Sequence, residues 1–112
     1  MLPDLSRYEK FVKLTNGTMR YYELGQGENH TILSHGMGVY TSADTFQFIL
    51  ESLAEKLHVF AIDCIGFGKS TRSIPNGLNF DVIVDGIREF MDVVGIQRAN
   101  YLGHSAGGWW GP

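Results

Sequence analysis

The chain has 112 residues, of which 44% are hydrophobic and 19% charged, and its formal net charge at pH 7 is −3. This length accommodates one domain, and the hydrophobic content suits a folded core rather than disorder. The nine lysines and arginines are scattered, so we expect no nucleic-acid partner. Cys64 is the only cysteine, which excludes an internal disulfide framework, and no apolar run is long enough for a secretory signal or a membrane span. We therefore expect a cytoplasmic protein with no membrane partner.

The first third of the chain predicts three strands. Asn16-Gly17 is typical of a hairpin turn, and it lies between strands expected over residues 11–14 and 18–24. A glycine-containing loop at residues 25–28 then leads to a third strand over residues 31–34.

The rest of the chain alternates between helical and strand patterns. Apolar residues recur at helical spacing over residues 42–57, with Ser42 as N-cap and Asp44 in the first turn. Residues 59–62 form a continuous apolar run, which is typical of a strand buried on both faces. A second helix is expected over residues 80–94, between the cap Asn79 and the stop Gly95, and a fifth strand over residues 98–102. Six apolar residues of the second helix are expected to face inward: Ile83, Val84, Ile87, Phe90, Met91 and Val94. The alternation predicts the α/β class, with a mostly parallel sheet and covering helices.

The strongest chemical motif follows the fifth predicted strand: Gly103-His104-Ser105-Ala106-Gly107. A strand that turns sharply into a helix exposes the serine at its apex, and Gly103 and Gly107 remove the Cβ atoms that would collide there. The backbone N–H of Ala106 would then lie at a helix N-terminus, where it can stabilise an oxyanion. A five-residue motif of this kind can occur by chance in a chain with 14 glycines. The strand predicted directly before it favours a catalytic role.

Three segments that each follow a predicted strand agree with one another. They are His35-Gly36-Met37-Gly38, residues 63–70 and residues 103–108. Their order and spacing resemble the N-terminal half of the α/β-hydrolase fold family, over about residues 10–112.

The resemblance assigns roles to individual positions. It implies that Ser105 is the nucleophile and that the backbone N–H groups of Met37 and Ala106 form the oxyanion hole. It also implies that Asp63 is structural and ties down the loop through residues 66–68. Supporting positions in the loop and the nucleophile turn would be His35, Gly36, Gly103, His104 and Gly107. The implied chemistry requires no metal and no other cofactor.

The order of the catalytic triad is the main departure from the family. In this family the acid and the histidine follow the serine. The four histidines, which are His30, His35, His58 and His104, all precede Ser105, and only seven residues follow it. We therefore expect residues 1–112 to be an incomplete hydrolase domain that is inactive alone, with activity in a longer parent. The exposed apolar sheet edge of such a piece would favour self-association.

Other function classes fit less well, with one exception. The segment from Gly66 to Ser70 ends like a phosphate loop, but Asp63 stands where the first glycine of that motif should be. The histidines and Cys64 lack the spacing of metal ligands. A non-catalytic, ligand-binding member of the same fold stays an alternative, because fold does not determine function.

The implied reaction is acyl transfer to water from a small carboxylic ester or related substrate. Residues 63–70 and 95–99 are also similar to carbon–carbon hydrolases that cleave meta-ring-fission products, so this activity is a second alternative. His104, before the nucleophile, is more usual in esterases and lactonases. A serine at position 105, rather than an aspartate, argues against dehalogenases and epoxide hydrolases.

Overall fold

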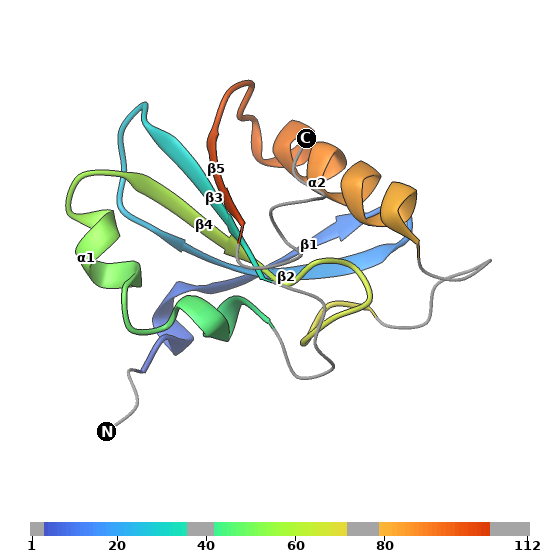
Figure 1. Cartoon of the computed structure of the whole chain (residues 1–112), viewed down its shortest axis with the longest axis horizontal. Coiled ribbons are helices and arrows are strands. Elements are labelled where there is room, and N and C mark those ends of the chain that lie inside the picture. Colours follow the sequence, from blue (N-terminus) through green and yellow to red (C-terminus); the bar gives the residue numbers. More distant parts are fainter. Residues whose placement is uncertain (1–3, 36–41, 72–78, 104–112) are drawn as a thin grey trace.

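The computed structural model describes residues 4–35, 42–71 and 79–103 as a five-stranded sheet with helices against both faces (Figure 1). The strands are β1 (Glu9–Leu14), β2 (Gly17–Leu24), β3 (His30–Ser34), β4 (His58–Ile62) and β5 (Asn100–Gly103). The α-helices are α1 (Leu50–Ala54) and α2 (Phe80–Val94), and two short 3₁₀ helices, η1 (Ser6–Tyr8) and η2 (Ala43–Phe46), complete the described elements.

The strand order across the sheet is β1-β2-β4-β3-β5. β2 runs antiparallel to both β1 and β4, whereas β3 runs parallel to both β4 and β5. The Asn16-Gly17 hairpin returns the chain directly, with Gly17 at a φ of 132°. Each parallel pair instead needs a crossover through other elements. The predicted α/β class is confirmed, and the sheet is mixed.

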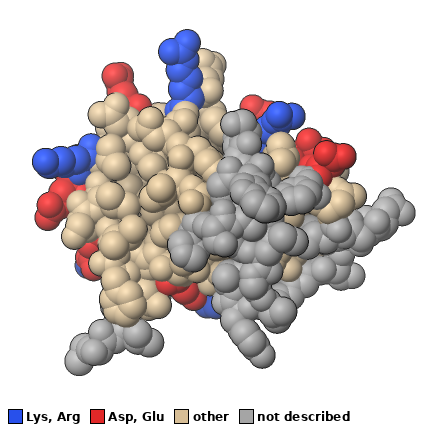
Figure 2. Space-filling model, viewed as in Figure 1, with Lys and Arg blue, Asp and Glu red and all other residues tan. Residues whose placement is uncertain are grey.

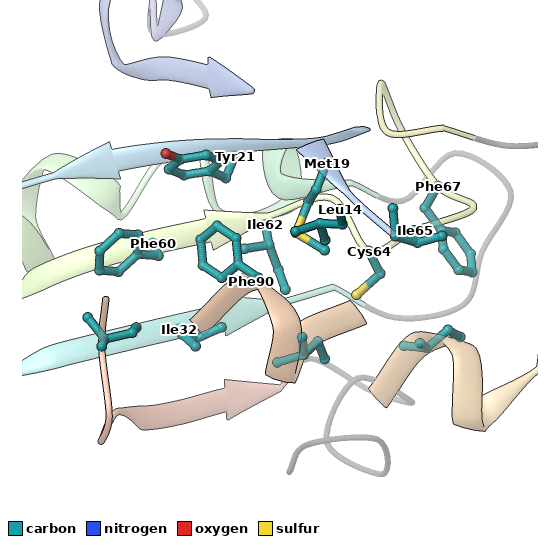
Figure 3. Packing of buried hydrophobic residues seen from close by; sticks show 13 residues of the cluster. Leu14, Met19, Tyr21, Ile32, Phe60, Ile62, Cys64, Ile65, Phe67 and Phe90 are labelled. Carbon is teal, nitrogen blue, oxygen red and sulfur yellow. The ribbon is translucent and has the colours of Figure 1, made fainter. Parts of the chain in front are cut away.

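α2 has the predicted bounds. The Asn79 side chain accepts a hydrogen bond from the Val82 N–H at its start, and Gly95 ends it at a left-handed φ of 81°. Its buried face packs on one side of the sheet, where the rings of Tyr21 and Phe90 meet edge to face with centroids 4.9 Å apart (Figure 3). The expected inward-facing residues of this helix all belong to or contact that core.

The first helix differs from its prediction. Residues 42–57 form η2 and α1 rather than one continuous helix. Ser42 does cap the segment, because its hydroxyl accepts a hydrogen bond from the Asp44 N–H at 3.1 Å. Contacts made by Ala43 and Asp44 with the sheet tighten this first turn, so tertiary contacts override the helical periodicity.

Side chains that alternate along the strands contribute to two apolar cores on opposite faces of the sheet. One core lies between the sheet and α2, and the other lies between the sheet and α1 with η2. β4 contributes to both, and its residues 59–62 are at most 2% exposed, as predicted for a strand covered on both faces. β5 starts and ends later than predicted and lies at one end of the strand order. Leu102 on β5 is 48% exposed, and the expected self-association at this edge stays a prediction.

Candidate active site at the carboxyl edge of the sheet

The three parallel strands end level with one another. Ser34 at the end of β3 pairs with Ile62 of β4 on one side and with Gly103 of β5 on the other. We call this end of the sheet the carboxyl edge. Of the sequence-predicted site residues, the structure describes His35 and Gly103 here. The other six lie outside the described residues: Gly36, Met37, His104, Ser105, Ala106 and Gly107.

His35 joins the loops that follow β3 and β4. It is fully buried, and its Nε2 accepts a hydrogen bond from the Cys64 N–H at 3.0 Å. The His35 ring also meets the ring of Phe67 edge to face, with centroids 4.9 Å apart. An Nε2 that accepts a hydrogen bond places the proton of a neutral imidazole on Nδ1. His35 thus links the two loops through its ring, and its role in the proposed site stays a prediction.

Asp63 connects three segments through one buried carboxylate. Oδ1 accepts a hydrogen bond from the Ala43 N–H at 2.6 Å, and Oδ2 accepts one from the Lys69 N–H at 2.8 Å. Oδ2 also accepts the Nε–H of Arg20 at 2.8 Å. Hydrogen bonds from backbone N–H groups stabilise an ionised carboxylate and fix the loops that donate them. The structure therefore gives Asp63 the structural role that the sequence predicts.

The Asp63 carboxylate leaves no room for a side chain at position 68, so this position requires glycine. Its φ is +55°, and a Cβ atom at this position would lie 2.3 Å from Oδ2 of Asp63. Any other residue would displace the carboxylate from the backbone groups that it binds. The glycine at position 68 thus allows the loop after β4 to pack closely against the Asp63 carboxylate.

Arg20 also belongs to this buried network, and the sequence did not predict its place there. It lies on β2 with its side chain 1% exposed, and it pairs with Asp63 on one side and Asp44 on the other. Its guanidinium also lies over the ring of Tyr22, 4.6 Å from the centroid. Burial alone would lower the pKa of Arg20, but the hydrogen bonds to Asp44 and the charge of Asp63 raise it. A lone arginine within an apolar strand was the available signal, because a buried charge requires a partner.

Asp44 and Tyr22 complete this ionic network. Burial raises the pKa of Tyr22 to about 12, and its hydrogen bond to Asp44 acts in the same direction. Burial would also raise the pKa of Asp44, but hydrogen bonds from Tyr22 and Arg20 hold it below its ordinary value. Arg20 therefore faces a phenol that is neutral at pH 7 and the acidic side chains of Asp44, Asp63 and Glu9, the last with its Oε2 3.9 Å from the Arg20 Nε.

The described part of the chain shows no grouping of three or more histidine, cysteine or acidic side chains arranged to hold a metal ion. In the same residues, no helix has the length and apolar character needed to span a bilayer. Figure 2 shows charged side chains of both signs around the rim of one face, and the part of that face not covered in grey is mostly uncharged between them.

A family model described as alpha/beta hydrolase fold matches residues 29–109. The chain belongs to the alpha/beta hydrolase fold family. The matched range contains the three segments that carry the resemblance in the sequence.

Curated relatives of this α/β-hydrolase chain include enzymes with different substrates. The chain is 30% identical over 105 residues to the dihydrolipoyllysine-residue acetyltransferase component of the acetoin cleaving system of Cupriavidus necator. The match covers 94% of this chain and 27% of that protein. The chain is also 29% identical over 105 residues to the 2-hydroxy-6-oxononadienedioate/2-hydroxy-6-oxononatrienedioate hydrolase of Paraburkholderia xenovorans, covering 88% of this chain and 36% of that protein. The chain therefore spans about a third of the length of the curated relatives that it matches.

Solved structures agree with this assignment. The meta-cleavage product hydrolase CumD superposes with a TM-score of 0.85 at 29% identity, over 94% of this chain and 39% of that one. A haloalkane dehalogenase variant from Bradyrhizobium elkanii superposes with a TM-score of 0.81 at 25% identity, over 91% of this chain and 33% of that one. The activities that the names of these relatives give differ, and they include an acetyltransferase component, a meta-cleavage product hydrolase and a haloalkane dehalogenase.

Proposed function

We propose that this chain is the nucleophile-bearing part of a serine hydrolase. In this proposal Ser105 attacks the carbonyl of a carboxylic ester or related acyl substrate. The acid and the histidine come from residues beyond Pro112 in a longer parent protein. Two findings support this second point: the triad order of the family, and the share of its relatives that the chain spans.

One observation carries the proposal: β3 and β5 end at residues that pair with each other in the sheet. Ser34 pairs with Gly103, so the chain leaves both strands side by side at the carboxyl edge. Ser105 is two residues beyond Gly103, and Met37 is three residues beyond Ser34. Consecutive Cα atoms are about 3.8 Å apart, so both residues stay within roughly a dozen ångström of the paired strand ends. This proximity supports an oxyanion hole made by the N–H groups of Met37 and Ala106.

The proposed reaction has two steps. The Ser105 hydroxyl transfers its proton to the histidine of the parent and forms a bond to the carbonyl carbon. The resulting oxyanion accepts hydrogen bonds from the Met37 and Ala106 N–H groups. Collapse of this intermediate expels the alcohol, which takes the proton, and water then releases the acyl group from Ser105 by the same route. Each oxyanion donor is expected to contribute about a hundredfold or more to the rate.

Carbon–carbon bond hydrolysis is the second candidate. The similarity to CumD and to the hydrolase of Paraburkholderia xenovorans favours it. The substrate of that class is a dienoate ketone, and the same serine and oxyanion hole would serve it. His104 before the nucleophile supports the ester substrate instead.

The decisive experiment is covalent labelling of the parent protein with a fluorophosphonate, with the Ser105→Ala variant as the control. Labelling that disappears in the variant supports the nucleophile, and the 112-residue chain alone is expected to stay unlabelled. A folded parent protein that takes no label contradicts the proposal and favours a non-catalytic binding role. Turnover of a p-nitrophenyl ester against loss of dienoate absorbance then separates the two substrates.

A further inference from the structure

We propose that Arg20 is a positioning residue for this reaction. Through Asp63 and Asp44 it fixes the residues that flank positions 36–41, the stretch that contains the proposed oxyanion donor Met37. This inference rests on the proposed function, and it extends that function to a strand residue remote from the nucleophile in sequence.

The residues on either side of positions 36–41 are anchored to the same loop. His35, which precedes this stretch, accepts the Cys64 N–H at 3.0 Å. Ala43, shortly after it, donates its N–H to Asp63 at 2.6 Å. Asp63 and Cys64 are neighbours in the chain, so one short piece of the loop after β4 sets the separation of the two anchors.

The second anchor is the hydrogen bond from Ala43 to Asp63. Arg20, on β2, links this anchor to the sheet through two carboxylates, those of Asp63 and Asp44. Its Nε donates to Oδ2 of Asp63 at 2.8 Å, and its two terminal nitrogens lie 3.3 and 3.4 Å from the carboxylate oxygens of Asp44. Asp44 directly follows Ala43, so both contacts bear on the residues just after positions 36–41. A planar guanidinium can span two carboxylates, whereas the ammonium of a lysine is a single point charge.

The backbone of Arg20 is held by the sheet and by the loop after β4. It pairs with Phe11 of β1, its N–H donates to the Ser70 hydroxyl at 2.8 Å, and its carbonyl accepts the Asp63 N–H at 2.9 Å. With a side chain only 1% exposed, the guanidinium has little freedom to follow a displaced loop. A rigid support of this kind matters because a displacement of about 1 Å at a catalytic group can cost on the order of a hundredfold in rate.

The test compares Arg20→Lys in the parent protein with Arg7→Gln, a control that removes an exposed ion pair to Glu51 at 3.1 Å. Steady-state hydrolysis of a p-nitrophenyl ester gives kcat and KM, and hydrogen exchange reports on the Ala43 N–H. For Arg20→Lys we expect kcat to fall by about tenfold to a hundredfold, KM to change by less than about threefold, and the Ala43 N–H to exchange faster. The Arg7→Gln variant should retain the kcat, KM and exchange of the original protein.

A second variant covers the case in which Arg20→Lys does not fold. Asp44→Asn removes the charge of one arm of the network and keeps the buried pair between Arg20 and Asp63, and it should lower kcat by several-fold. A folded Arg20→Lys protein with unchanged kcat overturns the inference, whatever its hydrogen exchange. A parent protein that neither labels at Ser105 nor hydrolyses the ester overturns the proposed function, and with it any role of Arg20 in the reaction. The two failures are distinguishable because only the second affects the unsubstituted protein.

Discussion

The parallel strands carry polar clusters at both ends, and the two clusters differ in what they bind. At the amino edge, where β3 and β4 begin, His30 and His58 lie with their Nδ1 atoms 3.0 Å apart. The Nε2–H of His58 donates to Glu23 at 2.6 Å, and Lys10 pairs with the other oxygen of that carboxylate at 2.8 Å. This cluster joins side chains to side chains across β1, β2, β4 and β3.

The carboxyl edge instead joins side chains to the backbone of loops. Asp63 and His35 are fully buried, and both accept hydrogen bonds from loop N–H groups. Glu23, by contrast, is 25% exposed. A side chain that binds backbone groups determines the path of a loop, whereas one that binds another side chain only links two strands. At the carboxyl edge the buried side chains thus fix the paths of loops, whereas at the amino edge the side chains link strands.

The largest expected effect is that of Asp63→Asn. This change keeps the shape of the side chain but leaves buried Arg20 without its nearest charge, and it places an amide nitrogen near N–H donors. Removing one partner of a buried ion pair typically costs about 3–5 kcal/mol. We expect a loss of this size in the free energy of unfolding, measured by urea denaturation at pH 7.

The control for this prediction is Glu51→Gln, which removes an ion pair whose two side chains are 71% and 56% exposed. It should leave the unfolding midpoint almost unchanged. If both variants lost the same free energy of unfolding, the buried ionic network would stabilise the fold no more than an exposed ion pair does.

A smaller effect is expected for Gly68→Ala, and Gly95→Ala provides a matched comparison. Both glycines have positive φ, but an added Cβ meets Asp63 at Gly68 and has open space within 4 Å at Gly95. Gly95→Ala should therefore cost only the left-handed backbone penalty, about 1 kcal/mol. Gly68→Ala adds a steric clash and should cost at least about 2 kcal/mol. Thermal unfolding of the two variants measures the difference, and equal costs would contradict the close packing around Asp63.

The smallest effect is expected at the amino edge, from Glu23→Gln. Burial alone would raise the pKa of Glu23, but hydrogen bonds from Lys10 and His58 hold it below its ordinary value. A carboxylate with a lowered pKa in the folded state contributes stability above its unfolded pKa of about 4.3 and loses it as the pH falls through the folded value. We expect the variant to be less stable by up to about 1 kcal/mol at pH 7. In urea titrations the two proteins should approach equal stability as the pH falls from about 4.3 through the lower pKa of folded Glu23, and a difference that persists below that pKa would place the effect elsewhere.

The fold was predictable from the sequence where local signals agreed with the tertiary contacts. α2 has a cap residue, a periodic apolar face and a terminal glycine, and its observed bounds match the prediction. The segment after Ser42 has a similar periodicity, but its first turn bonds to Arg20 and Asp63, residues that are distant in the sequence. No local pattern encodes such contacts, and the predicted single helix was wrong.

The candidate site was predicted from its motifs, and six of its eight predicted residues lie outside the described part of the chain, so their roles stay predictions. The resemblance implied a structural role for Asp63, and its hydrogen bonds from two loop N–H groups match that role. Arg20 was missed because its importance depends on which strand lies beside β4. The strand order places β2 there, and a sequence pattern gives strands but not their neighbours.

The position of β3 between β4 and β5 also affects the order in which the described strands can pair. Residues 31–34 pair with residues 100–103, so one side of β3 waits for the last described strand to be made. Contacts between distant parts of a chain form slowly, whereas the hairpin of β1 and β2 closes locally. During synthesis the hairpin, β4 and the loop after it can assemble before β5 leaves the ribosome. Among the five described strands, β5 is then the last to pair, and it joins the sheet beside β3.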